Sequence, residues 1–110
     1  MTASKAKGTA AETAVVNYLR ACGLATFRMP LTGRQDQGDV YIADPDITVE
    51  VKNCERKELA AWVDEAYREA GNADTLVGVV WHKRRGQGSP GEWFVTMDGE
   101  TFVNLLKGRG

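Results

Sequence analysis

The sequence predicts a mixed α/β domain in which helices flank a central β-sheet, with the element order α-β-β-β-α-β-β-α. Two observations support this fold class. Apolar residues recur with helical spacing in two long segments, and five shorter segments have the apolar pattern of strands. The chain has 110 residues, of which 43% are hydrophobic and 26% charged. This composition is typical of a globular protein with one core, so residues 1–110 are predicted to form a single domain.

The first half of the chain predicts one helix and three strands. Residues 1–7 are small and polar and are expected to fray. Residues 8–22 carry the apolar stripe of a helix, with Thr9 as a possible cap and Gly23 at its end. The strands are expected at residues 24–28, 39–42 and 47–52. The last two are joined by a short, turn-rich connection, which predicts a β-hairpin.

The second half predicts two helices and two strands. Residues 57–70 form the clearest helix, because its apolar stripe comprises Leu59, Trp62, Val63, Ala66, Tyr67 and Ala70. Residues 75–81 are apolar on both faces, which is typical of a strand covered on two sides. A Gly-rich basic loop at 82–91 precedes a strand at 93–97. A final helix at 101–106 is expected to be capped by Asp98.

Composition argues against several functional classes. No apolar run approaches the roughly 20 residues that span a bilayer, and the N-terminus lacks a signal-peptide pattern, so we expect a cytoplasmic protein without a membrane partner. A closed zinc site is not expected, because the chain has two cysteines and one histidine. Cys22 and Cys54 are expected to be buried or half-buried free thiols. The three tryptophans are expected to pack in the core or in a dimer contact.

Three charged residues are predicted to converge at one end of the hairpin. Glu50 and Lys52 share a face of the strand at 47–52, and Asp39 begins the preceding strand. An ordinary ion pair on a solvated sheet face is one interpretation. However, two adjacent carboxylates repel, and a divalent cation such as Mg²⁺ relieves that repulsion. A lysine beside such an ion can help to deprotonate a water molecule or stabilise charge on a phosphate, which favours metal-assisted phosphodiester hydrolysis.

Glu12 is a second residue whose charge conflicts with its position. At 100° per residue it projects between Val16 and Leu19, on the apolar side of the first helix. A carboxylate there is costly unless it meets a cation or a hydrogen-bond donor. It can simply complement the helix dipole, or it can act at or near the predicted metal.

These residues resemble the PD-(D/E)xK nuclease superfamily and, within it, the archaeal-type Holliday junction resolvases and their phage-encoded relatives. The resemblance rests on Glu12, the Gly-Asp pair at 38–39 and the Glu-Val-Lys run at 50–52. It extends over almost the whole chain, since residues 28–33 are similar to an R-x-P-x-S-G stretch and residues 7–12 to a K-G-x-x-x-E start. The chain departs from the pattern at Thr32, where serine is usual, and at Gly38, where the superfamily name has proline.

The resemblance implies a restriction-endonuclease-like fold and a homodimer that cuts branched DNA, a four-way junction, with Mg²⁺ or Mn²⁺. It implies that Asp39 and Glu50 are metal ligands, that Lys52 is the catalytic lysine and that Glu12 assists at the metal. If the chain is phage-encoded, it would act in the host cytoplasm. A nuclease of the same fold acting on flaps, nicks or duplex DNA is an alternative, as is a DNA-binding module without catalysis.

The formal net charge of −1 gives no overall sign of a DNA partner, because a DNA-binding domain is usually basic. Positive charge is nevertheless concentrated locally. We expect DNA contacts from residues near the predicted metal and from the basic loop, namely Arg28, Thr32, Arg34, Lys83, Arg84 and Arg85. The acidic residues are expected to gather elsewhere, at Asp44, at Asp46 and along the second helix.

Overall fold

Five strands form one mixed sheet in the order β1-β2-β3-β4-β5. The structure is a computed structural model and describes residues 3–30 and 38–108. The helices of this part are α1 (Ala3–Ala21), α2 (Leu59–Ala73) and α3 (Gly99–Lys107), with a short 3₁₀ turn η1 (Pro90–Glu92). The strands are β1 (Thr26–Arg28), β2 (Val40–Ile42), β3 (Ile47–Lys52), β4 (Val77–His82) and β5 (Phe94–Thr96). The predicted element order is confirmed.

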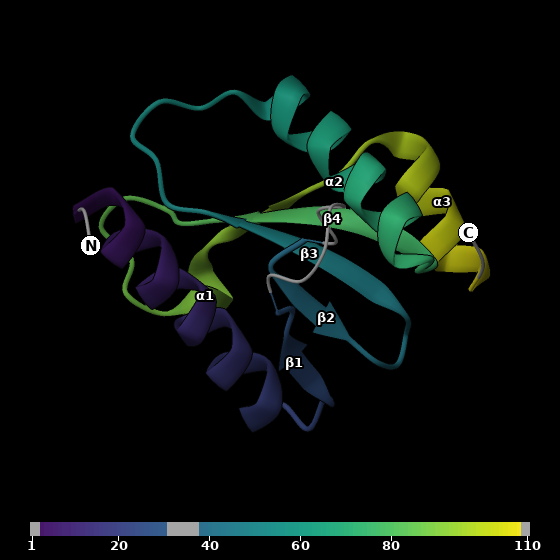
Figure 1. The fold of residues 1–110 in the computed structure, drawn as a ribbon, viewed down its shortest axis with the longest axis horizontal. Helices are drawn as coiled ribbons and strands as arrows, with labels where there is room; N and C mark the ends of the chain where they lie inside the picture. Colours follow the sequence, from purple (N-terminus) through teal and green to yellow (C-terminus); the bar gives the residue numbers. More distant parts are fainter. Residues whose placement is uncertain (1–2, 31–37, 109–110) are drawn as a thin grey trace.

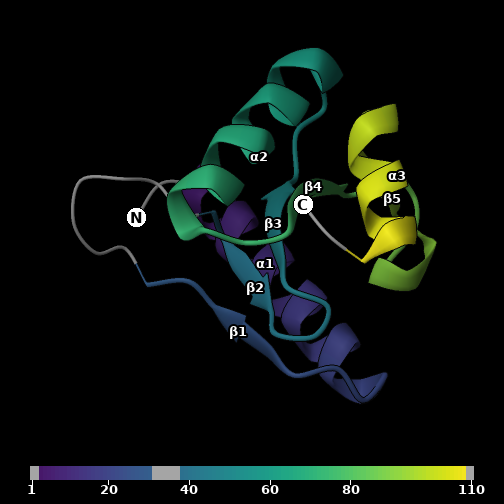
Figure 2. The same ribbon diagram turned by 90° about the vertical axis from the view of Figure 1, so that its right-hand side faces the viewer.

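The sheet is antiparallel except at its centre. β2 and β3 form the predicted hairpin, whereas β3 and β4 are parallel. A parallel pair needs a crossover connection, and α2 supplies it, which places α2 against one face of the sheet. Figure 1 shows α2 on one side of the sheet and α1 on the other. Figure 2 shows β1 and β5 at opposite edges, with α3 beside the β5 edge.

The core has one layer on each face of the sheet. Val15 of α1 packs with Val40 and Val49 on one face, and Trp62 and Ala66 of α2 pack on the other. β3 is therefore buried on both faces, including the polar side that faces α2. A solvated sheet face, one of the two interpretations of Glu50 and Lys52, is wrong at Glu50, which is only 5% exposed.

The elements begin and end in places other than those predicted. α1 starts at Ala3, so Thr9 lies inside the helix rather than at its cap. α2 buries Trp62, Ala66, Glu69 and Ala70, while Tyr67 is 65% exposed. The buried stripe of α2 is therefore rotated away from the one predicted. Asp98 caps α3 as expected, accepting the Thr101 N–H at 2.8 Å.

Trp62 and Trp93 are buried, as the sequence predicts for core residues. Cys22 and Cys54 are free thiols but are exposed, so the expected burial of both is wrong. Within the described residues, no helix combines the length and apolarity needed to cross a bilayer.

Two glycines allow close backbone packing around β3. The φ angle of Gly38 is +89°, and a Cβ atom there would lie 2.5 Å from Thr48 Cγ2. Proline is confined to φ near −65°, so this backbone cannot accept the proline of the superfamily pattern. A Cβ atom at Gly78 would overlap the backbone of Ala66, so glycine at this position of β4 lets α2 approach the sheet.

Candidate functional site

Asp39 and Glu50 meet at the open end of the β2–β3 hairpin. Val40 pairs with Val49, so Asp39 and Glu50, the next residues outward, lie opposite each other. The Asp39 N–H donates to the Val49 carbonyl at 3.2 Å, and the Val51 N–H donates to Asp39 Oδ2 at 2.8 Å. These bonds fix the Asp39 carboxylate beside Glu50, and the predicted convergence of the two residues is confirmed.

Glu50 lies in an environment that opposes its ionisation. Burial, followed by the negative charge of Asp39 and the adjacent Glu69 carboxyl, raises the pKa of Glu50 to about 11. Its Oε1 atom is buried and has no hydrogen-bond partner among the described residues. Without an added cation, these surroundings therefore favour the protonated form of Glu50.

Two further carboxylates come from α2. Oxygen atoms of Glu50, Glu65 and Glu69 lie within 4.8 Å of one another, and Glu69 is fully buried. The expectation that the acids of the second helix lie away from the site is therefore wrong for these two residues. One sequence signal could have found Glu69: seven positions after Trp62, it projects roughly 20° from Trp62 and so falls inside the buried stripe.

Lys52 is held on three sides. Its Nζ atom lies 3.1 Å from Glu50 Oε2, 2.9 Å from Glu65 Oε1 and 6.0 Å from the centre of the Trp62 ring. Burial alone lowers the pKa of Lys52, but the hydrogen bonds and charges of Glu65 and Glu50 outweigh it, so the pKa is raised. The amine is thus a fixed ammonium group directed at the carboxylates.

Glu12 meets the cation that its apolar position requires. Its Oε1 atom lies 2.7 Å from Arg28 Nη2, and Arg28 Nη1 donates to Thr13 Oγ1 at 2.6 Å. Burial and the charge of Asp39 raise the pKa of Glu12, outweighing the opposite effect of Arg28. Glu12, Arg28 and Asp39 line one cavity of about 320 Å³. The structure therefore brings Glu12 to the Asp39 side of the site, and brings Arg28 with it.

The other predicted DNA-contacting residues are dispersed. Thr32 and Arg34 lie outside the described residues. Lys83 and Arg85 line a common cavity near the end of β4. The Arg84 guanidinium lies 5.2 Å from the Phe94 ring centre and is not among the described residues that line that cavity. The basic loop is thus divided, because Lys83 and Arg85 share one cavity and Arg84 packs on Phe94.

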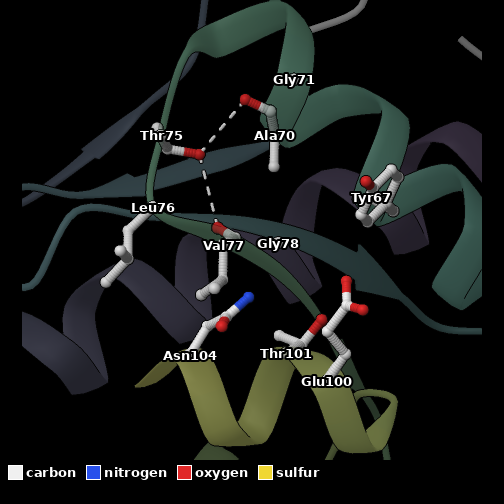
Figure 3. Close-up of a pocket in the computed structure, with 10 residues that line it drawn as sticks. All are labelled: Tyr67, Ala70, Gly71, Thr75, Leu76, Val77, Gly78, Glu100, Thr101 and Asn104. Atoms are coloured by element: carbon white, nitrogen blue, oxygen red, sulfur yellow. Dashed lines mark hydrogen bonds between the residues drawn. The ribbon is translucent and has the colours of Figure 1, made fainter. Parts of the chain in front are cut away.

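The site lies at the carboxyl ends of the parallel strands β3 and β4, where Lys52 pairs with His82. Open α/β sheets commonly bind ligands at this end. A cavity of about 260 Å³ lies at the other end, between α2 and α3 (Figure 3). There Thr75 Oγ1 is within hydrogen-bond distance of the Ala70 and Val77 carbonyls, and Glu100 is the one carboxylate among the lining residues. That cavity lacks the paired charges of the β3 end.

Among the described residues, the carboxyl groups of the site outnumber its basic side chains. It contains five carboxylates and two basic side chains, namely Glu12, Asp39, Glu50, Glu65 and Glu69 with Arg28 and Lys52. Clustered oxygen ligands of this kind suit a hard divalent cation. No protein-family model matches the sequence, and no curated protein matches it. The function is therefore inferred from the geometry of the site itself.

Proposed function

We propose that the protein is a metal-dependent DNA endonuclease with a restriction-endonuclease-like fold. The observation that carries this proposal is the arrangement around Glu50. This carboxyl is buried beside Asp39, has an oxygen that no described residue meets with a hydrogen-bond donor, and lies 3.1 Å from the ammonium of Lys52. An ordinary surface ion pair would not place the buried Glu50 carboxyl group beside the half-buried Asp39, because ionisation of both would cause repulsion that one lysine does not compensate.

The donor atoms fit Mg²⁺ or Mn²⁺. Asp39 and Glu50 would hold the ion, and Glu12 stands next to Asp39 on the side of Arg28. The buried Glu50 Oε1 atom would gain the positive partner that the described residues do not offer it. When bound, the ion would supply Lewis-acid charge that lowers the pKa of water and neutralises phosphate oxygens.

The protein's own groups account for the remaining requirements of phosphodiester hydrolysis. Lys52 presents a fixed positive charge to the phosphate, because Glu65 holds its Nζ atom at 2.9 Å. The Val51 N–H keeps the Asp39 carboxylate in one orientation. Arg28 contributes a second positive charge at the opposite side of Asp39, where it can contact the DNA backbone.

We propose a four-way DNA junction as the substrate, on the resemblance of Glu12, Asp39, Glu50 and Lys52 to the resolvase pattern. Two strands of a junction must be cut, and each chain offers one such site, so the active form is a homodimer. A nuclease of the same fold acting on flaps, nicks or duplex DNA uses the same residues. A DNA-binding module without catalysis would not need the buried carboxylates.

The test is cleavage of labelled DNA by the wild type, Asp39→Ala and Lys52→Ala with and without Mg²⁺. Wild-type protein is expected to cut only with Mg²⁺, and both variants are expected to lose at least about a hundredfold in rate. Asp64→Ala is the matched control, because Asp64 is an exposed acid next to Glu65 on α2. Cleavage that survives both site substitutions would overturn the assignment.

The choice of DNA substrate separates the alternatives. A resolvase cuts the four-way junction in preference to linear, nicked and flapped DNA of the same sequence. Preference for a flap or nick would keep the nuclease proposal and replace the substrate. DNA binding that is indifferent to Mg²⁺, with no cleavage of any substrate, would favour the non-catalytic module.

A further inference from the structure

A basic cavity lies immediately beside the proposed active site. It measures about 380 Å³ and is lined by four basic side chains and one acidic side chain, namely Lys7, Lys57, Lys83 and Arg85 with Glu55. These residues come from α1, from the segment between β3 and α2, and from the turn after β4. The sequence analysis does not include Lys7 and Lys57 among the residues expected to contact DNA.

This basic cavity is connected to the carboxylate site through shared residues. A second cavity of about 420 Å³ shares Lys7, Asn53, Cys54 and Glu55 with it and also contacts Lys52. That second cavity shares Gly8 with the third one, which contains Arg28 and Asp39. Three hollows therefore follow one another from the Lys83 turn, past Lys52, to Arg28.

The turn that carries Lys83 is tied to the catalytic strand. The Lys83 N–H donates to the Lys52 carbonyl at 2.9 Å, and the Lys57 ammonium donates to the Cys54 carbonyl at 3.2 Å. Lys83 Nζ also lies 5.8 Å from the Trp93 ring centre. The Lys57 side chain is therefore held by Cys54, and the Lys83 side chain by Trp93. The backbone of Lys83 is held by Lys52, the residue that ends β3.

We propose that this basic cavity is a phosphate-binding subsite for the DNA strand cut at the neighbouring carboxylates. The proposal rests on the nuclease function and specifies the path of the substrate: the strand enters at the basic cavity, passes Lys52 and leaves beside Arg28. Lysine and arginine side chains are the groups that neutralise backbone phosphates. The described residues that line the cavity include no aromatic ring, so it suits a phosphate and not a stacked base.

Gly8 lies where two of these cavities meet. It is part of α1 and lines the two cavities on either side of it. A Cβ atom at this position would meet no atom within 4 Å, so alanine fits without disturbing the protein. A larger side chain would extend into the path of the strand, which makes Gly8 a steric probe of the proposed route.

The direct test is DNA binding by fluorescence anisotropy in Ca²⁺, used in place of Mg²⁺ to suppress cleavage, across a salt series. Lys57→Ala with Arg85→Ala is expected to weaken binding at least about tenfold and to lower the slope of log affinity against log salt by about two. Lys107→Ala is the matched control, because this exposed lysine lies on α3, outside all three cavities. Gly8→Leu is expected to weaken binding, whereas Gly8→Ala is not.

Strands with a 5′-phosphate and with a 5′-hydroxyl identify which phosphate is bound. A gain in affinity from the 5′-phosphate that disappears in the double variant means that the subsite binds a strand end. Equal affinities, both weakened by the double variant, mean that it binds an internal phosphodiester.

Cleavage measured in parallel separates this proposal from the nuclease assignment. If the wild type cuts DNA and the double variant binds as tightly as Lys107→Ala, the subsite is overturned and the nuclease stands. If the wild type binds but does not cut, and the double variant still weakens binding, the subsite stands without catalysis. A wild type that binds no DNA overturns both.

Discussion

The Glu50 carboxyl group is only 5% exposed, so its surroundings differ strongly from water. Its pKa of about 11 lies far above the value of about 4.3 in an unfolded chain. From about pH 4.3 to about pH 11 the unfolded state releases a proton that the folded state retains, so the free energy of unfolding falls as pH rises. In the absence of metal, the buried Glu50 carboxyl group thus destabilises the folded protein, although the proposed function depends on it.

Replacing Glu50 with glutamine removes the contribution of this carboxyl group to the pH dependence of the free energy of unfolding. In metal-free buffer at about pH 8, we expect Glu50→Gln to raise the free energy of unfolding by about 1–3 kcal/mol, with a smaller gain at about pH 5. Urea denaturation at the two pH values measures the difference. Asp64→Asn, a change at an exposed acid, is the control and should be nearly neutral. A Glu50→Gln variant that is less stable at both pH values would show that Glu50 is ionised and satisfied in the metal-free fold.

Glu65 is predicted to position Lys52. Its Oε1 atom lies 2.9 Å from Lys52 Nζ. Glu65 would therefore still hold the ammonium group when Glu50 coordinates a metal ion. We expect Glu65→Ala to lower kcat about tenfold with little change in KM, and Glu65→Gln, which keeps an acceptor oxygen, to lose less. Steady-state cleavage kinetics and the Mg²⁺ concentration for half-maximal rate provide the measurement.

The Mg²⁺ dependence distinguishes positioning from metal binding. A positioning role leaves the half-maximal Mg²⁺ concentration unchanged, whereas loss of a metal ligand raises it. Asp64→Asn again serves as the neighbouring control. A Glu65→Ala variant with wild-type kcat would show that Glu50 alone suffices to hold Lys52.

At the scale of elements, the approach of α2 to β4 brings Glu65 and Glu69 to the site. Ala66 lies between these two glutamates, and its backbone occupies the space that a Cβ atom at Gly78 would need. We expect Gly78→Ala to destabilise the protein by about 1–3 kcal/mol and to lower cleavage, because α2 must move outward.

Gly71 provides a matched control for Gly78. It lies within α2, and a Cβ atom there meets nothing within 4 Å. Gly71→Ala is therefore expected to stabilise the protein by about 0.5–1 kcal/mol through helix propensity. Thermal denaturation of both variants tests the pair. If Gly78→Ala leaves the stability unchanged, α2 can move away from β4 without a loss of stability.

The local patterns of the sequence were sufficient for the element order and for the Asp39–Glu50 pairing. A hairpin with period-two alternation fixes which residues face each other, and helical spacing identifies α1 and α2. The acidic residues of α2 are the part that sequence patterns place wrongly, because they are expected away from the site. Burial of Glu69 depends on how closely α2 packs over β3 and β4, and that distance is set by glycine at position 78, far along the chain.

At the scale of the whole molecule, the net charge of −1 conceals a separation of charge. Five carboxylates collect at the end of β3, and four basic side chains line the cavity beside them. A bound divalent cation would offset part of the acidic group and leave the basic cavity available to phosphates. Overall composition therefore argues against a broadly basic surface and not against a local DNA path.

One chain supplies one cluster of this kind among the described residues, so cutting two strands of a junction requires two chains. We expect sedimentation equilibrium to give twice the 12.0 kDa mass of one chain at the concentrations where junction cleavage is observed. Junction cleavage by a monomer would contradict the resolvase interpretation and favour a nuclease that cuts single sites.

Asp39 and Glu50, side by side at the open end of the β2–β3 hairpin, are proposed to bind a divalent cation. Calorimetric titration of Mn²⁺ in buffers of different ionisation enthalpy measures both the binding and the protons released. Because Glu50 retains a proton without metal, we predict binding with release of up to about one proton per ion at about pH 7.5, and loss of both in Glu50→Gln. Absence of Mn²⁺ binding, or unchanged binding and proton release in Glu50→Gln, would contradict the proposed metal site.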